Sequence, residues 1–211
     1  MTTAPLVFGL AVGFALFLFV SMTSFVKLSV VFMIIRQALG MQQVPSNMIL
    51  MALAVFISAF VAKPVFVQAV AAASDLAGAL ETPQDYLNVA VAAITPFQRF
   101  IGLNTEPEHI DFLMEVADEV WRGSGVSASN GDLMIQIPAF LLSELTEAFR
   151  IGFLLYLPFV AIDLAITGIL MALGMQMVQP NIIAVPFKLL TFVFVDGWGR
   201  LIEGLILTYT D

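Results

Sequence analysis

Four ionisable residues lie within the last apolar stretch of the chain, which runs from Pro186 to Tyr209. They are Lys188, Asp196, Arg200 and Glu203. On one continuous helix, at about 100° per residue, all four would fall within an arc of roughly 120°. A charge in hydrocarbon costs about 2.5–3.5 kcal/mol even on the lenient insertion scale. We therefore expect this stripe to face protein or water, in a membrane-inserted component of a larger assembly.

The composition argues against an ordinary soluble domain. Of the 211 residues, 60% are hydrophobic and only 11% are charged, too few to cover the apolar surface of a chain this size. The net charge of −8 is concentrated between Ala72 and Gln136, where ten acidic and two basic residues lie. An acidic central segment argues against nucleic acid as a partner.

Four apolar segments are long enough to cross a bilayer, which needs about 20 residues, and segments that enter lipid must be helical. Their approximate limits are 5–35, 47–74, 150–173 and 182–208. They pair as two hairpins. Lys63 and Pro64 interrupt the second segment, and Pro158 and Asp163 interrupt the third. Because proline breaks or kinks a helix, we expect bent hairpins packed against partners.

The predicted fold is an all-α membrane protein in three parts: an N-terminal helical hairpin over 1–75, an acidic helical segment over 76–136, and a C-terminal helical hairpin over 137–211. In the middle part, Thr82–Asp85 and Thr105–Glu108 both fit a helix start, with an N-cap hydroxyl, an early proline and an acid three residues later. Residues 123–131, rich in Gly and Ser, predict a flexible linker.

Orientation follows from the charges near the first turn. The short loop 36–47 carries Arg36 and no acid, which favours the cytoplasm. The acidic segment would then lie across the membrane, in the periplasm of a Gram-negative cell. No Lys or Arg precedes the apolar run that begins at Ala4, and no clear small-x-small cleavage site lies ahead of Ser21, so we expect a retained first helix and not a cleaved signal peptide.

The segment Pro138–Gly152 opens the second apolar block and suits a first helical turn at its proline. It carries Glu144, Glu147 and Arg150. Glu147 and Arg150, three residues apart, can pair either as a surface salt bridge at a helix entry or in an inter-subunit contact. The charges of the closing stripe leave the same two alternatives, self-neutralisation within the helix or a polar seam against neighbouring subunits.

Methionines cluster around the turn that begins at Gly174. Met171, Met175 and Met177 lie there, with Gln176 between the last two. Methionine usually fills cores, and this is one interpretation of the cluster. The alternative is a flexible apolar seal, because unbranched thioether side chains can close around varied surfaces and reopen.

Enzymatic signatures are missing from the sequence. It contains no HExxH, GxSxG, P-loop or GxGxxG pattern. Cys is absent and His109 is the single histidine, so carboxylates alone would have to hold any metal. We predict a non-catalytic protein with no cofactor and no metal, and we expect His109 to be an exposed surface residue.

Several segments resemble the type III secretion export-gate family, which comprises flagellar FliP and its injectisome counterparts of the SctR, YscR and HrcR type. The segment Arg36–Gly40, followed by Val44–Asn47, is similar to the first hairpin turn of the family. Pro138–Phe153, with its PAF…SEL…AFRIG pattern, resembles one family signature, and Pro186–Trp198 resembles the other. The likeness covers nearly the whole chain, least so its middle, and the missing signal peptide favours the injectisome branch.

The resemblance implies a role in protein export. Family members form a pentamer-like ring with two small membrane subunits, of SctS and SctT type, and with other export-apparatus and basal-body components. This helical channel lies at the bacterial inner membrane, projects toward the periplasm and passes unfolded secreted proteins. A small-solute membrane transporter or channel is the alternative, because intramembrane charges and broken helices fit that class too.

The resemblance also suggests roles for single residues. It implies a channel constriction, a methionine gasket, at Met175, Gln176 and Met177, where glutamine replaces the middle methionine of the family. Arg36, Gly40, Pro45 and Asn47 would form the hairpin turn. Inter-subunit polar contacts would come from Glu144, Glu147, Arg150, Lys188, Asp196, Arg200 and Glu203.

Overall fold

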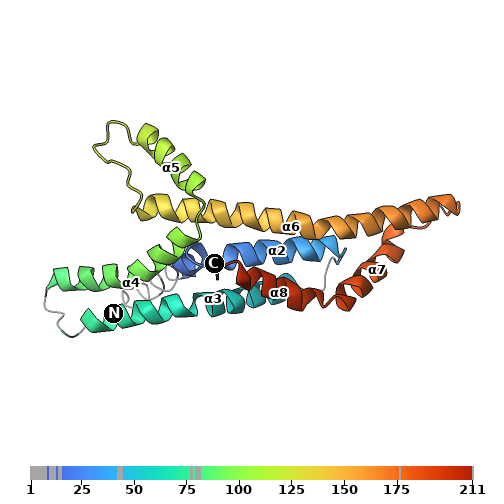
Figure 1. Cartoon of the computed structure of the whole chain (residues 1–211), viewed down its shortest axis with the longest axis horizontal. Coiled ribbons are helices and arrows are strands. Elements are labelled where there is room, and N and C mark those ends of the chain that lie inside the picture. Colours follow the sequence, from blue (N-terminus) through green and yellow to red (C-terminus); the bar gives the residue numbers. More distant parts are fainter. Residues whose placement is uncertain are drawn as a thin grey trace. The chain divides into compact units, whose positions relative to one another are not determined.

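The computed structural model describes residues 9, 13, 16–41, 45–76, 78, 82–175 and 177–210. Within these ranges the regular structure is helical, as predicted (Figure 1). A short helical stretch over 16–21 comes first. The labelled helices are α2 Phe25–Ala38, α3 Asn47–Leu76, α4 Pro83–Leu103, α5 Pro107–Val120, α6 Leu133–Ala172, α7 Pro180–Phe194 and α8 Gly197–Leu207.

Among the described residues, two helices are long and apolar enough to cross a membrane, α3 with 30 residues and α6 with 40. Helices α7 and α8 meet at an angle of 61° and would together make a third span. At 1.5 Å per residue, α6 is about 60 Å long, roughly twice the thickness of a hydrocarbon core. Part of α6 therefore extends beyond any single bilayer crossing.

Prolines do not end the long helices. Helix α3 runs through Pro64, and α6 runs through Pro138 and Pro158. The prolines therefore do not break these helices, and the bends expected at Pro64 and Pro158 remain a prediction. Each proline removes one backbone hydrogen bond from its helix. The many bonds on either side of that site keep helices of 30 and 40 residues continuous.

Helix α6 begins five residues before the proline at which it was predicted to start. Asp132 caps it, because its Oδ1 accepts from the Met134 N–H at 2.8 Å. The Asp132 carbonyl accepts from the N–H groups of Ile135 and Gln136, at 3.0 and 2.8 Å. A short acceptor side chain at this position is a strong start signal, and Pro138 follows inside the helix.

The two predicted helix starts of the acidic segment have different outcomes. Thr82 caps α4 with the predicted capping box, in which the Thr82 N–H donates to Asp85 Oδ2 at 2.8 Å. Helix α5 has Pro107 in its first turn, but its N-cap is Glu106, which makes no side-chain cap bond. The Thr105 hydroxyl donates instead to the Ile101 carbonyl of the preceding helix, at 2.7 Å.

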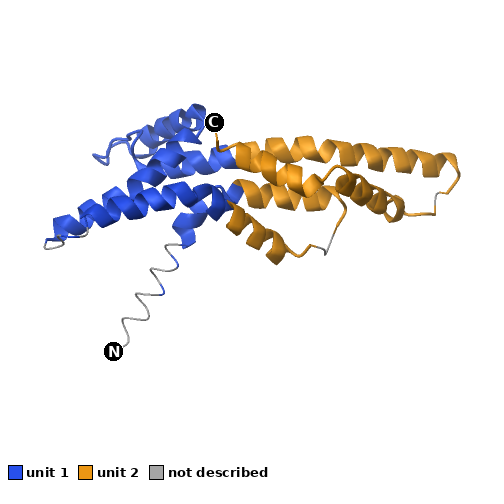
Figure 2. Ribbon diagram, turned by 60° about the horizontal axis from the view of Figure 1, so that its bottom comes forward, with its two compact units in different colours: residues 1–26, 58–145 blue, residues 27–57, 146–211 orange. Residues whose placement is uncertain are grey.

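The chain divides into two compact units, which are described separately (Figure 2). Unit 1 comprises residues 1–26 and 58–145, and unit 2 comprises residues 27–57 and 146–211. The core of unit 1 is formed by Met22, Ile101 and Phe140. In unit 2, Trp198 packs edge-on against Phe32 and Phe192. The predicted division into three consecutive parts remains a prediction.

Candidate functional site: polar contacts of the helical hairpins

The four residues of the closing stripe do not lie on one helix. Lys188 is on α7, Asp196 lies at the break, and Arg200 and Glu203 are on α8. The expected single arc is therefore wrong. Asp196 adopts a left-handed conformation with φ 51°, which aspartate tolerates better than most residues. This conformation lets the chain turn by 61° between the two helices.

Lys188 joins three elements of unit 2. Its ammonium nitrogen lies 2.6 Å from Asp163 Oδ2 on α6 and 2.9 Å from the carbonyl oxygen of Ala38. Ala38 is the last residue of α2, and a carbonyl at a helix end has no partner within its own helix. Lys188 is only 5% exposed, so both contacts hold a charge that is buried within the chain. Charge-assisted bonds of this kind are stronger than neutral ones.

The structure brings three predicted hairpin-turn residues together. Arg36 Nη1 donates to Asn47 Oδ1 at 2.5 Å and to the carbonyl oxygen of Pro45 at 3.4 Å. Gly40 ends α2 with φ 74°, a conformation that favours glycine. A Cβ at Gly40 would lie 2.7 Å from a methyl carbon of Val185, so α7 packs closely on this turn.

A polar cavity of about 360 Å³ lies between the turn and the buried ion pair. Arg36, Asp163, Asn181 and Lys188 line it. Arg36 Nε and Asp163 Oδ1 are buried and have no hydrogen-bond partner among the described residues. A cavity with unsatisfied donors and acceptors is suited to ordered water, which would bridge the two groups.

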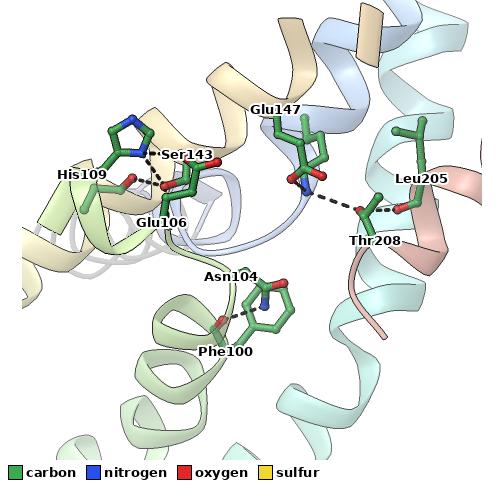
Figure 3. A network of polar contacts seen from close by, with 10 residues as sticks. Phe100, Asn104, Glu106, His109, Ser143, Glu147, Leu205 and Thr208 are labelled. Atoms are coloured by element: carbon green, nitrogen blue, oxygen red, sulfur yellow. Dashed lines mark hydrogen bonds and ion pairs between the residues drawn. The ribbon is translucent and has the colours of Figure 1, made fainter. Parts of the chain in front are cut away.

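Glu144, Glu147 and Arg150, at the start of the second apolar block, differ in burial and in their contacts. Glu144 is buried, with 1% of its surface exposed. Glu147 Oε2 lies 2.5 Å from the ammonium nitrogen of Lys27 (Figure 3). Among the described residues, Glu147 therefore pairs with Lys27 and not with Arg150, which is exposed. The surface pair predicted from their spacing is replaced by a bond between two helices.

On α8 the predicted self-neutralisation is not observed. Asp196, Arg200 and Glu203 are all exposed, and no ion pair joins them within the part of the chain that the structure describes. Arg200 instead lines an apolar cavity of about 370 Å³, together with Phe159 and Phe192. The three charges are therefore available to groups outside the chain.

The methionines lie at the end of α6. Gly174, with φ 72°, terminates the helix, and the Met175 N–H donates to the Leu170 carbonyl at 2.9 Å in a Schellman turn. Met175 is 43% exposed and Met177 is 99% exposed. Gln176 lies outside the described residues. Met175 and Met177 therefore do not fill the core of this chain, and their side chains are exposed.

His109 is half-buried, contrary to the predicted exposed position. Its Nδ1 lies 2.8 Å from the hydroxyl oxygen of Ser143, which also accepts the Glu106 N–H at 2.9 Å (Figure 3). Although Ser, His and Glu meet here, Ser143 and Glu106 both lie nearest to the same ring nitrogen. A catalytic triad places its two partners on opposite nitrogens. These contacts instead hold the first turn of α5 against α6.

Lys27 and Asp163 were missed as contact residues. The sequence showed them only as charges that end or interrupt apolar segments. An ionisable residue in such a segment is itself a signal, because it must find a partner. Their partners could not be identified from spacing, since Glu147 and Lys188 lie 120 and 25 residues away, respectively. Within the described residues, no group of three His, Asp or Glu side chains could hold a metal ion.

Comparisons with known proteins agree with one another. The sequence profile of the FliP family matches residues 9–205. The chain is 44% identical over 203 residues to the probable translocation protein y4yL of Sinorhizobium fredii, covering 95% of this chain and 90% of the relative. It is 44% identical over 206 residues to the hypersensitivity response secretion protein HrcR of Ralstonia nicotianae, covering 95% and 94%. It is 41% identical over 191 residues to Yop proteins translocation protein R of Yersinia pestis, covering 89% and 87%.

Proposed function

From the premise that the chain belongs to the FliP family and is a non-enzymatic membrane component of type III protein export, we propose that it forms the wall of the export channel. Several copies would surround the path by which unfolded proteins leave the cytoplasm. The observation that carries this proposal is the outward position of Met175 and Met177 at the end of α6. Apolar side chains that project from a single chain need other copies, or cargo, to cover them.

Exposed apolar side chains support assembly with further copies. Helix α6 buries few residues of its most apolar window within the chain, and Phe149, Phe153 and Leu154 are at least 60% exposed. Because α6 is about twice as long as a bilayer core is thick, lipid cannot cover all of it. A pentamer-like ring with SctS-type and SctT-type subunits would cover the remainder. Other apparatus components would adjoin this ring at the inner membrane, with the acidic segment on its periplasmic side.

The polar residues would act in assembly in two ways. Arg150, Asp196, Arg200 and Glu203 are exposed and would contact neighbouring subunits directly. Glu144, Glu147 and Lys188 are buried or paired inside the chain, so they would support assembly by holding the helices in place. The turn of Arg36, Gly40, Pro45 and Asn47 would belong to the same supporting structure.

The methionine pair and Gln176 would form the constriction. Thioether side chains have three rotatable bonds and can close on one another or around a passing chain. Glutamine in the middle position would add a hydrogen-bonding group to an otherwise apolar ring.

Native mass measurement tests the proposal. We expect the purified full chain in detergent to form a multimer, and to form a larger particle when it is produced with its two small membrane partners. A stable monomer that carries a small solute into liposomes would overturn the proposal and favour the solute transporter.

A further inference from the structure

We infer that Lys27 forms a docking site for residues 208–209, which follow α8, and that this contact holds helix α8 against α2. The inference goes beyond the export function, because it concerns how the last helix is held within one chain. Lys27 is the third residue of α2, and only 1% of it is exposed. A buried ammonium group has lost its bound water, so it needs hydrogen-bond or ion-pair partners within the protein.

Among the residues that the structure describes, at least three groups lie around this ammonium nitrogen. Glu147 of α6 supplies a carboxylate oxygen at 2.5 Å. Thr208 supplies its hydroxyl oxygen at 3.4 Å, and the ring centroid of Tyr209 lies 4.1 Å away. Lysine has three N–H donors and no acceptor, so a carboxylate, a hydroxyl oxygen and an aromatic face are matched partners.

The residues after α8 are prepared for this contact. The Thr208 hydroxyl donates its hydrogen to the Leu205 carbonyl at 2.9 Å, which leaves its oxygen lone pairs for the lysine (Figure 3). Tyr209 follows in a turn whose N–H donates to the Ile206 carbonyl at 3.1 Å. The next residue, Thr210, is exposed. The captured segment therefore ends at Tyr209, and its ring covers the ammonium group.

The position of helix α8 is thus set by a different interaction at each end. At its start, Asp196 adopts the left-handed conformation that bends the chain away from α7. At its end, residues 208 and 209 meet Lys27. Between them, α8 buries Leu201 and Leu205. Apolar contacts of two leucines do not by themselves fix the position of α8 along its axis. The contacts of Lys27 with the Thr208 hydroxyl and the Tyr209 ring are specific to these two residues. The Lys27 site therefore fixes the position of α8 relative to α2.

A spin label tests this site in the full-length protein in detergent. The sequence contains no cysteine, so Thr210→Cys creates a single attachment point next to Tyr209. We expect a restricted nitroxide in this otherwise unchanged chain. Lys27→Met keeps an unbranched stem but removes the charge, and should shorten the rotational correlation time of the label several-fold. Lys27→Arg, which keeps the charge and stacks on aromatic rings, should leave the label restricted.

Matched variants keep the test interpretable. Lys63→Met removes an exposed lysine from α3 and should leave the label unchanged. If Lys27→Met does not fold, the site is tested from its other side, because Tyr209→Leu leaves Lys27 and its partner Glu147 in place. Tyr209→Leu should free the label, and Tyr209→Phe, which retains the ring, should not. Equal label mobility in the parent and in Tyr209→Leu would overturn the inference. The readout is label motion and not secretion, so its failure leaves the channel proposal standing.

Discussion

The ammonium nitrogen of Lys188 lies 2.6 Å from Asp163 Oδ2, and the same nitrogen bonds the final carbonyl of α2. One side chain of α7 thereby fixes the positions of α2 and α6. The two charged residues are 25 positions apart and lie on different helices, in segments that composition describes as almost purely apolar. Their pairing gives the buried charge of Lys188 a counter-charge within the chain.

Replacing only one residue of this ion pair should destabilise the protein more than replacing both residues with apolar ones. Asp163→Ala leaves a buried ammonium without its counter-charge, and we expect a loss of about 2–4 kcal/mol, less than for a fully buried pair because Asp163 is partly exposed. Asp163→Leu combined with Lys188→Met should lose less than either single change. Thermal unfolding in detergent measures the cycle, and strictly additive effects would show that the two residues are not coupled.

Gly40→Ala should destabilise the first hairpin turn. The residue has φ 74°, and a Cβ would lie 2.7 Å from Val185, so both backbone strain and a steric clash oppose the change. We expect a loss of at least about 1 kcal/mol, measured by thermal unfolding. Gly204→Ala is the matched control, because Gly204 lies within α8 with open space around its Cα. That change should be neutral or stabilising, and equal losses at both glycines would contradict the prediction.

Met175→Ala together with Met177→Ala should make cells permeable to small ions while secretion continues. The reason is that the double change removes apolar side chains from the proposed seal but leaves the path intact. Ion leakage and secretion are measured in the same strain. Met134→Ala, at an exposed methionine near the start of α6, should leave the membrane tight. If the double variant is as impermeable as its parent, the assignment of the constriction to Met175 and Met177 is wrong.

Arg200→Ala should weaken assembly of the ring. Arg200 has no ion-pair partner among the described residues, so its partners are expected on neighbouring subunits, together with Asp196 and Glu203. Leaving an acid unpaired in a dry interface costs about 3–5 kcal/mol. Native mass measurement should show fewer complete oligomers, whereas Lys63→Ala should assemble normally. Unchanged assembly of the Arg200 variant would mean that this face is solvated.

Sequence reasoning succeeded where the signal is local. The capping box of Thr82 and Asp85 is confirmed because all its atoms lie within four residues. The sequence also predicts α3 and α6 as candidate membrane spans, because a bilayer crossing requires a minimum length of apolar sequence. The start of α6 differs from the predicted one because the side chain of Asp132 caps the helix and Pro138 is accommodated within it.

Long-range pairing could not be predicted. The spacing of Glu147 and Arg150 fits an ion pair on one helix, but burial of Lys27 gives Glu147 a more desolvated partner. Likewise, the periodicity of the closing stripe assumed an unbroken helix. Only the backbone shows that Asp196 adopts the left-handed conformation, and no residue pattern nearby requires it.

The left-handed backbone of Asp196 determines how long the last segment is from end to end. A residue with a Cβ in this conformation carries roughly 1–2 kcal/mol of conformational energy, which would be released on straightening. From Pro180 to Leu207 a straight rod would measure about 42 Å, more than a hydrocarbon core requires. Paired labels at 182 and 206 would distinguish the extended from the folded-back form. A straight segment would have the length to cross a bilayer in one piece, and the bend at Asp196 shortens the end-to-end distance that it spans.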